Sequence, residues 1–357
     1  MNSGKQFFTA LEALRGIAAV MVMFLHTGGT LGPIPANISY LGVDLFFLLS
    51  GVVLANSYEK RLTAGEISPA GFLLHRIIRL YPLYLLSLPV GFVSYALQND
   101  VESPVGLIVR AILLIPNGNP NGAFPLNEPS WSLFFELWAG LLFAVLLIRL
   151  SFRTLLIIAL GAACITTYGA WVGGNFDIGH QAGYFAFGFS RVLFSFSLGI
   201  CLYRLYDVRK PNTVKNGNVT GLLICGCLIL ITNIPAIIFF GFPCFDLSIC
   251  LVIFPAIVWI AMRTTQTGRM ELIFRWLGRL SYPIYILHGP IFSLLHVLRQ
   301  QGFNLPASPA AGMIVVIALF ILAGIITTRF DEPVRKKLRM IVSPNPPSAG
   351  HVDSASA

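Results

Sequence analysis

Ten separate stretches of this sequence are apolar and long enough to cross a bilayer, and no other feature limits the fold as strongly. A spanning helix needs about 17–25 mostly apolar residues, because its backbone polar groups must bond within the segment. The 357 residues are 56% hydrophobic and 11% charged, whereas a soluble chain carries about 25% charged residues. We therefore predict an all-α integral membrane protein with about ten transmembrane helices. The stretches lie near 8–27, 40–57, 80–97, 131–149, 154–172, 188–206, 219–240, 246–262, 281–298 and 311–329.

The basic residues give the predicted spans a direction across the membrane. Lys and Arg collect in cytoplasmic loops during insertion. With the amino terminus inside, three of the 24 Lys and Arg residues face outside, Arg15 lies within a span, and the other 20 face inside. Both termini are therefore predicted to be cytoplasmic, and the net charge of +9 indicates membrane insertion rather than nucleic-acid binding. The three outside residues are Arg110, Arg191 and Arg299.

A further apolar segment, 104–115, is predicted to lie at the interface or to re-enter the membrane without crossing it. The segment is shorter than a span and contains Arg110. Counting it as a span would reverse every later loop and destroy the charge asymmetry.

The sequence predicts one membrane domain, 1–342, followed by a disordered cytoplasmic tail, 343–357, rich in Ser, Pro and Ala. The apolar start is interpreted as a retained first span, because Glu12 and Arg15 interrupt it and no small-residue cleavage site follows. The six Cys residues lack the spacing of a zinc or redox site. They are predicted to be packing residues, and no metal cofactor is expected.

Arg15 and His26 are two ionisable residues inside the first apolar stretch. Such groups rarely occur at membrane depth without a partner or a function. Eleven residues of helix amount to about three turns, so the two side chains share a face and lie ~16 Å apart along the axis. The charge count places Arg15 toward the cytoplasm and His26 toward the outside. Alternatively, Arg15 pairs with Glu12 at the helix end and His26 is merely interfacial.

Arg76 and Arg79 share a helical face at the cytoplasmic mouth of the third predicted span. Two guanidinium groups placed in this way suit bidentate binding of phosphates. Taken alone, they are better explained as topology-determining charges.

Two carboxylates lie near the outer ends of predicted spans. Glu136 is one to two turns inside its span, after Trp131, which is predicted to belong to an interfacial belt. A buried carboxylate needs a partner, and we expect His26 at a similar depth. Asp44 enters the second span from the same side and is either functional or a helix N-cap.

The ninth predicted span carries a polar stripe. Ser281, Tyr285 and His288 fall on one face at i, i+4 and i+7. We expect this stripe to face a cavity rather than lipid.

Together these stretches resemble the acyltransferase-3 family of membrane acyltransferases over about residues 8–332. The order and spacing of several motifs carry the resemblance more than any single motif. The matching segments are 14–19 with His26, which resembles the family's Arg-x10-His signature, then 42–51, 76–82, 131–136 and 281–288.

The resemblance implies O-acylation, usually acetylation, of extracytoplasmic carbohydrates or glycosylated small molecules, with cytoplasmic acyl-CoA as donor. It also implies a multi-pass protein of the bacterial cytoplasmic (inner) membrane. Some members carry an appended extracytoplasmic esterase-like domain, whereas this chain is expected to be the stand-alone form.

The expected mechanism divides the work between the two ends of the first span. Arg15, Arg76 and Arg79 are expected to bind the CoA phosphates. His26 is expected to act as general base on an acceptor hydroxyl, oriented by Glu136. An acyl-His26 intermediate is a variant of this scheme. The main alternative is a proton-coupled transporter of sugars or lipids, and a scaffold without activity is a third reading.

Overall fold

The computed structural model describes residues 7–27, 38–101, 103–118, 122–233, 243–303 and 308–342, and within these ranges all regular structure is helical. The predicted tail, 343–357, lies outside the described residues. The α-helices are α1 (Thr9–Leu25), α2 (Gly42–Leu54), α3 (Lys60–Thr63), α4 (Pro69–Ala96), α5 (Pro104–Ile112), α6 (Ser130–Val145), α7 (Phe152–Gly173), α8 (Phe185–Arg209), α9 (Gly217–Asn233), α10 (Pro243–Ser248), α11 (Phe254–Met262), α12 (Gly268–Gln300), α13 (Pro309–Ile326) and α14 (Glu332–Val342).

Six helical runs are long and apolar enough to span a membrane, and two shorter helices are also apolar. The protein is therefore a multi-pass, all-helical membrane protein, and the count of ten spans stays a prediction. The six runs are Ser39–Thr63, Pro69–Ala96, Phe152–Gly173, Ala182–Arg209, Pro243–Met262 and Ala310–Val342, and the shorter helices are Ser130–Val145 and Gly217–Thr232.

Helix α5 covers most of the segment predicted not to cross the membrane. Its nine residues extend only about 14 Å, which is half of the hydrocarbon thickness. The hydroxyl of Tyr84 on α4 donates a hydrogen bond to the carbonyl oxygen of Ala111 on α5. Helix α5 is thus fastened to the bundle while its apolar side chains stay exposed.

The start of α4 follows directly from the sequence. The hydroxyl of Ser68 accepts a hydrogen bond from the amide of Gly71 at 3.0 Å, and Pro69 occupies the first turn of α4. A Ser N-cap with Pro in the first turn is a strong start signal. Helix α4 consequently begins eleven residues before the apolar window 80–97, which places Arg76 and Arg79 inside a helix.

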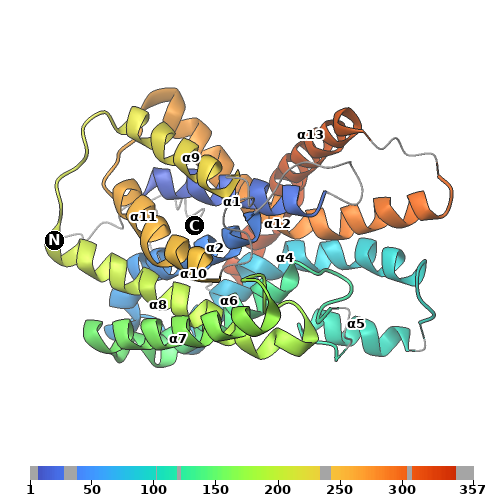
Figure 1. Cartoon of the computed structure of the whole chain (residues 1–357), viewed down its shortest axis with the longest axis horizontal. Helices are drawn as coiled ribbons and strands as arrows, with labels where there is room; N and C mark the ends of the chain where they lie inside the picture. Colours follow the sequence, from blue (N-terminus) through green and yellow to red (C-terminus); the bar gives the residue numbers. More distant parts are fainter. Residues whose placement is uncertain are drawn as a thin grey trace.

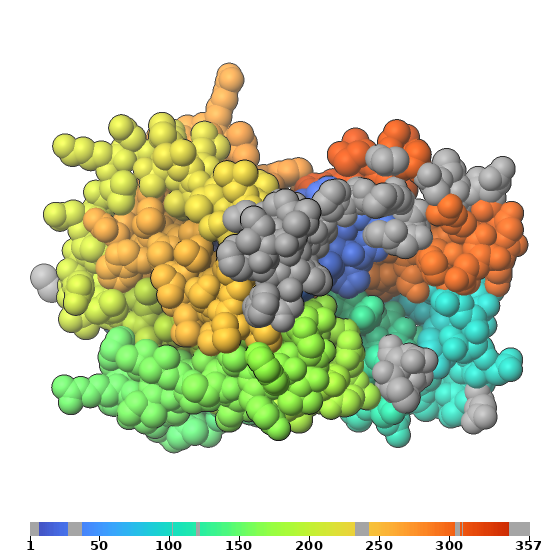
Figure 2. Space-filling model, viewed as in Figure 1, coloured from blue at the N-terminus to red at the C-terminus, as the bar shows by residue number. Residues whose placement is uncertain are grey.

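Helices α1 and α12 pack along each other in the middle of the bundle, and α2 packs against α8 (Figure 1). Glycines allow these close approaches, because a Cβ on Gly51 of α2 would overlap the carbonyl oxygen of Phe196 on α8. Small residues at helix contacts are typical of membrane bundles, since backbones can then approach closely. The carboxyl-terminal part of α12 lies with α13, α4 and α5 at one end of the molecule, and α8, α9 and α11 lie at the other (Figure 2).

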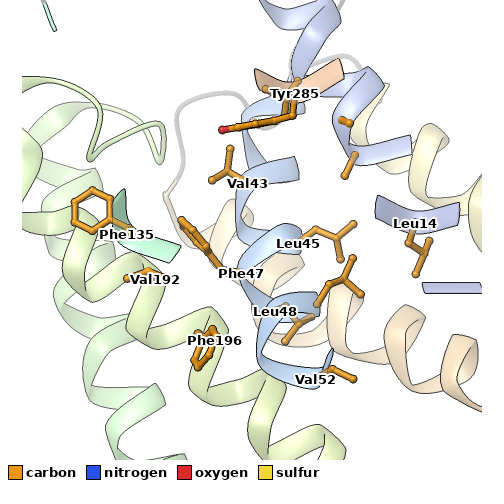
Figure 3. Close-up of a cluster of buried hydrophobic side chains, with 14 of the residues drawn as sticks. Leu14, Val43, Leu45, Phe47, Leu48, Val52, Phe135, Val192, Phe196 and Tyr285 are labelled. Atoms are coloured by element: carbon orange, nitrogen blue, oxygen red, sulfur yellow. The ribbon is translucent and has the colours of Figure 1, made fainter. Parts of the chain in front are cut away.

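The apolar core lies between α1, α2, α6 and α8. Leu14, Leu45, Leu48 and Phe196 are all buried there (Figure 3). Tyr285 enters this region from α12 with its hydroxyl pointing inward (Figure 3). Helices α1 and α12 therefore border the apolar core, and they carry half of the predicted site residues when His26, which directly follows α1, is included.

Candidate active site

Three arginines from two helices line one narrow cavity of about 70 Å³. Arg15 comes from α1, whereas Arg76 and Arg79 come from α4. The guanidinium of Arg79 donates no hydrogen bond to any residue in the described ranges. The charges of Arg15, Arg76 and Arg335 repel it, and the charge of Glu136 attracts it. Like charges gathered in a low-dielectric interior repel one another, so this end of the protein suits an anionic ligand.

Glu136 belongs to this arginine cavity and not to His26. Its carboxylate forms an ion pair with Arg76 and accepts a hydrogen bond from the hydroxyl of Ser50 at 3.1 Å. The expectation that Glu136 orients His26 is therefore wrong. The physical reason is that α4 begins eleven residues before the apolar window 80–97, so Arg76 lies within a helix that packs against α6.

The rest of the cavity wall is apolar and aromatic. Phe46, Leu49 and Val53 of α2 line it, together with Leu133 of α6 and Tyr282 of α12. An apolar wall beside an arginine cluster fits a ligand with an anionic head and an uncharged arm.

His26 lies at the other end of α1, directly after its last residue. Its Nδ1 is 2.8 Å from the carbonyl oxygen of Val22 and 3.3 Å from Nε2 of His288. A carbonyl oxygen can only accept, so Nδ1 of His26 carries the proton. Nδ1 of His288 likewise faces the carbonyl oxygen of Ile284 at 3.2 Å, which leaves the Nε2 lone pair of His288 to accept from His26. In a neutral imidazole with its proton on Nδ1, Nε2 carries the lone pair that can act as a base.

His26 opens into a second pocket of about 450 Å³. Its lining is rich in side chains with hydrogen-bonding groups. They are Tyr95, Gln98, Asn99, Asn127, Glu128, Ser293 and His296. We refer to this as the outer pocket, because the predicted topology places the end of α1 on the extracytoplasmic side.

The predicted polar stripe of α12 connects the two cavities. Ser281 and Tyr285 line the arginine cavity, and His288 contacts His26. The Tyr285 hydroxyl lies 2.7 Å from the Ser132 hydroxyl, and the Tyr285 ring packs edge-on against the His288 ring at 5.8 Å. All three stripe residues are buried, so the stripe faces the protein interior.

Residues 8–329 match the acyltransferase domain that defines the acyltransferase-3 family. The chain belongs to this family. It is therefore an acyltransferase, as the sequence motifs predicted.

Two curated relatives of this acyltransferase are similar over different lengths. Protein 2 in the picA locus of Rhizobium radiobacter is 35% identical over 183 residues, which cover 46% of this chain and 95% of that protein. The peptidoglycan O-acetyltransferase OatA of Listeria monocytogenes is 24% identical over 371 residues, which cover 93% of this chain and 56% of OatA. The acyltransferase thus spans just over half the length of OatA. No solved structure matches it.

A buried ion pair of the acyltransferase went unrecognised in the sequence. Arg191, counted on the outside, lies within α8, is 0% exposed, and donates to Asp44 on α2 at 2.7 Å. Asp44 is therefore neither a simple N-cap nor a free site residue. Trp131 covers the same guanidinium at 5.4 Å and is buried rather than interfacial. The two opposite charges, each in a predicted span, were the available signal.

The amino-terminal half of α12 and the carboxyl-terminal α14 are joined by a further ion pair. Arg279 donates to Glu332 at 2.6 Å through two of its nitrogens. Within the described ranges, no three His, Cys, Asp or Glu side chains come together as a metal site would require.

Proposed function

We propose that this acyltransferase moves an acyl group, usually acetyl, from cytoplasmic acyl-CoA to a hydroxyl of a carbohydrate outside the membrane. The observation that carries the proposal is that α1 links both ends of such a reaction. Arg15 lies in the arginine cavity, and His26 lies at the outer pocket. The name of OatA supports a cell-envelope glycan as acceptor, and the family supports a bacterial inner-membrane location.

The donor end is proposed to bind the phosphates of CoA. The guanidinium of Arg79 has no hydrogen-bond partner among the described residues. Arg76 instead forms an ion pair with Glu136, and Arg15 forms one with Glu12 at 3.3 Å. The two carboxylates thus position two guanidinium groups and leave the third for the ligand. The uncharged arm of acyl-CoA would then follow the apolar wall toward Tyr285 and bring its thioester near His26.

His26 is proposed to carry out the transfer step. Nε2 takes the proton of the acceptor hydroxyl while the oxygen bonds to the thioester carbonyl carbon. The carbon–sulfur bond of the tetrahedral intermediate then breaks, and CoA leaves as a thiolate that takes the proton from His26. Throughout the reaction, Nε2 of His288 accepts a hydrogen bond from Nδ1 of His26 and keeps this tautomer in place. An acyl-His26 intermediate would use the same nitrogen as nucleophile instead.

The test uses the full-length protein purified into liposomes, with radiolabelled acetyl-CoA and neutral oligosaccharides. We expect CoA release and ester formation, and both should fall at least 100-fold in His26→Ala, because general-base catalysis contributes about 10²–10⁴-fold. His75→Gln is the control, since His75 lines neither cavity. Full transfer by His26→Ala would contradict the mechanism, and movement of sugar without acetyl-CoA consumption would indicate a transporter.

A further inference from the structure

Asn127 lies in the wall of the outer pocket, which His26 also lines. Its side chain is 2% exposed and precedes α6. The side-chain Nδ2 donates to the carbonyl oxygen of Ile286 at 3.0 Å and to the hydroxyl of Ser87 at 2.7 Å. Because a carbonyl oxygen can only accept, these bonds fix which end of the amide is nitrogen.

The other end of the amide, Oδ1, is buried and has no hydrogen-bond partner among the described residues. Buried polar atoms are nearly always satisfied, so an orphaned acceptor in a pocket wall indicates where a ligand donates. Gly289, in the same wall, lies close to it, since a Cβ there would be 3.7 Å from Oδ1.

The surrounding pocket wall offers acceptors of the same kind. Nε2 of Gln98 donates to the carbonyl oxygen of Ser94 at 3.3 Å, and Nδ2 of Asn99 donates to that of Tyr95 at 3.0 Å. Both amide nitrogens are thus turned to the backbone of α4 and its end, so the amide oxygens remain for a ligand. A pocket lined with acceptor oxygens suits a ligand with several hydroxyl donors.

We infer that Asn127 Oδ1 receives a hydrogen bond from a second hydroxyl of the acceptor while His26 Nε2 takes the proton of the reacting one. The outer pocket therefore selects polyhydroxylated acceptors over simple alcohols. Asn127 is a binding residue in this scheme. The inference rests on the proposed function, because it requires acyl transfer at His26.

A competition experiment tests this inference independently of total activity. The full-length protein in liposomes receives acetyl-CoA with equimolar glycerol and 1-propanol, and the two acetyl esters are quantified. Wild type should favour glycerol, and Asn127→Leu should lower the glycerol-to-propanol ester ratio about tenfold, a typical effect of one hydrogen bond.

Two further variants separate the proposed contact from a structural role. Asn127→Asp keeps an oxygen at the Oδ1 position, and Ser87→Ala removes only a partner of Nδ2. Both should retain the wild-type ester ratio. An unchanged ratio in Asn127→Leu, or an equal loss in Asn127→Asp, would overturn the inference. No acetyl-CoA turnover by wild type would instead overturn the proposed function.

Discussion

Nε2 of His288 on α12 lies 3.3 Å from Nδ1 of His26 at the end of α1. This contact joins two residues 262 positions apart in the sequence, and it gives the Nδ1 hydrogen of the proposed base a second acceptor. The hydrogen on Nδ1 is shared between His288 and the carbonyl oxygen of Val22. His288 thereby acts on the reaction through His26, as a positioning residue.

His288→Leu is expected to lower the turnover number roughly tenfold or more without changing the KM for acetyl-CoA, because a misplaced base loses proton-transfer efficiency. His288→Gln restores an acceptor oxygen near Nδ1 and should recover part of the rate. Steady-state kinetics on both purified variants measure this. A rate loss that merely tracks the loss of folded protein would show that His288 is structural only.

Arg79→Gln should weaken acyl-CoA binding at least tenfold with little change in thermal stability. Arg79 has no hydrogen-bonded partner among the described residues, so its removal leaves no charge unpaired, while one charge-assisted contact to the donor is lost. Binding of a non-hydrolysable acyl-CoA analogue, followed by calorimetry, measures the change. Arg110→Gln on α5, which lies outside the arginine cavity, is the matched control, and equal weakening there would refute a specific phosphate contact.

Glu136→Ala should destabilise the protein by about 3–5 kcal/mol, because it leaves the buried guanidinium of Arg76 without its carboxylate. The double variant Arg76→Met/Glu136→Leu removes both charges and should regain most of that stability without regaining acyl-CoA binding. Thermal unfolding in detergent reports the first effect and ligand binding the second. A double variant as unstable as Glu136→Ala would contradict the ion-pair explanation.

Arg191→Met should also cost about 3–5 kcal/mol, since Asp44 would stay buried and unpaired. The exposed pair of Lys60 with Asp207 at 3.1 Å is the control, because surface pairs contribute only about 0–1 kcal/mol. Chemical unfolding curves of Arg191→Met and Lys60→Ala make the comparison. Similar curves for the two variants would mean that Asp44 and Arg191 do not hold α2 to α8.

Gly51→Ala is expected to separate α2 from α8 and lower the melting temperature, because its Cβ would overlap the backbone of Phe196. Gly161→Ala on α7 has no atom within 4 Å of the new Cβ and should be neutral or slightly stabilising. Melting temperatures of the two variants test the difference. A harmless Gly51→Ala would show that the helices can shift at no cost.

Local sequence rules predicted the features that depend on one helix at a time. Arg15 and His26 do share α1, Arg76 and Arg79 share α4, and Ser281, Tyr285 and His288 line the inward side of α12. Helical periodicity and the cost of burying polar groups are sufficient for these predictions. They failed where a helix extended beyond its apolar window, as α4 did around Arg76.

The same rules do not predict which side chains of different helices lie in contact. Glu136 was expected beside His26 and forms an ion pair with Arg76. Arg191 was counted on the outside and forms a buried ion pair with Asp44. Depth along one helix does not say how that helix is rotated or which neighbour it meets. Asn127 gave no sequence signal, because its significance arises from one oxygen left unpaired by contacts with α4 and α12.

The sequence by itself determined the membrane-embedded helical class, the acyltransferase family and the residues able to carry charge or protons, because these follow from hydropathy, periodicity and motif order. The tertiary structure alone decided which of those residues meet. It separated an arginine cavity from a histidine pocket, since packing α1 between α12 and α2 leaves Arg15 and His26 at opposite ends of one buried helix. Contacts between distant helices determine which ionisable residues pair, because several pairings are equally favourable from the chemistry of each helix alone.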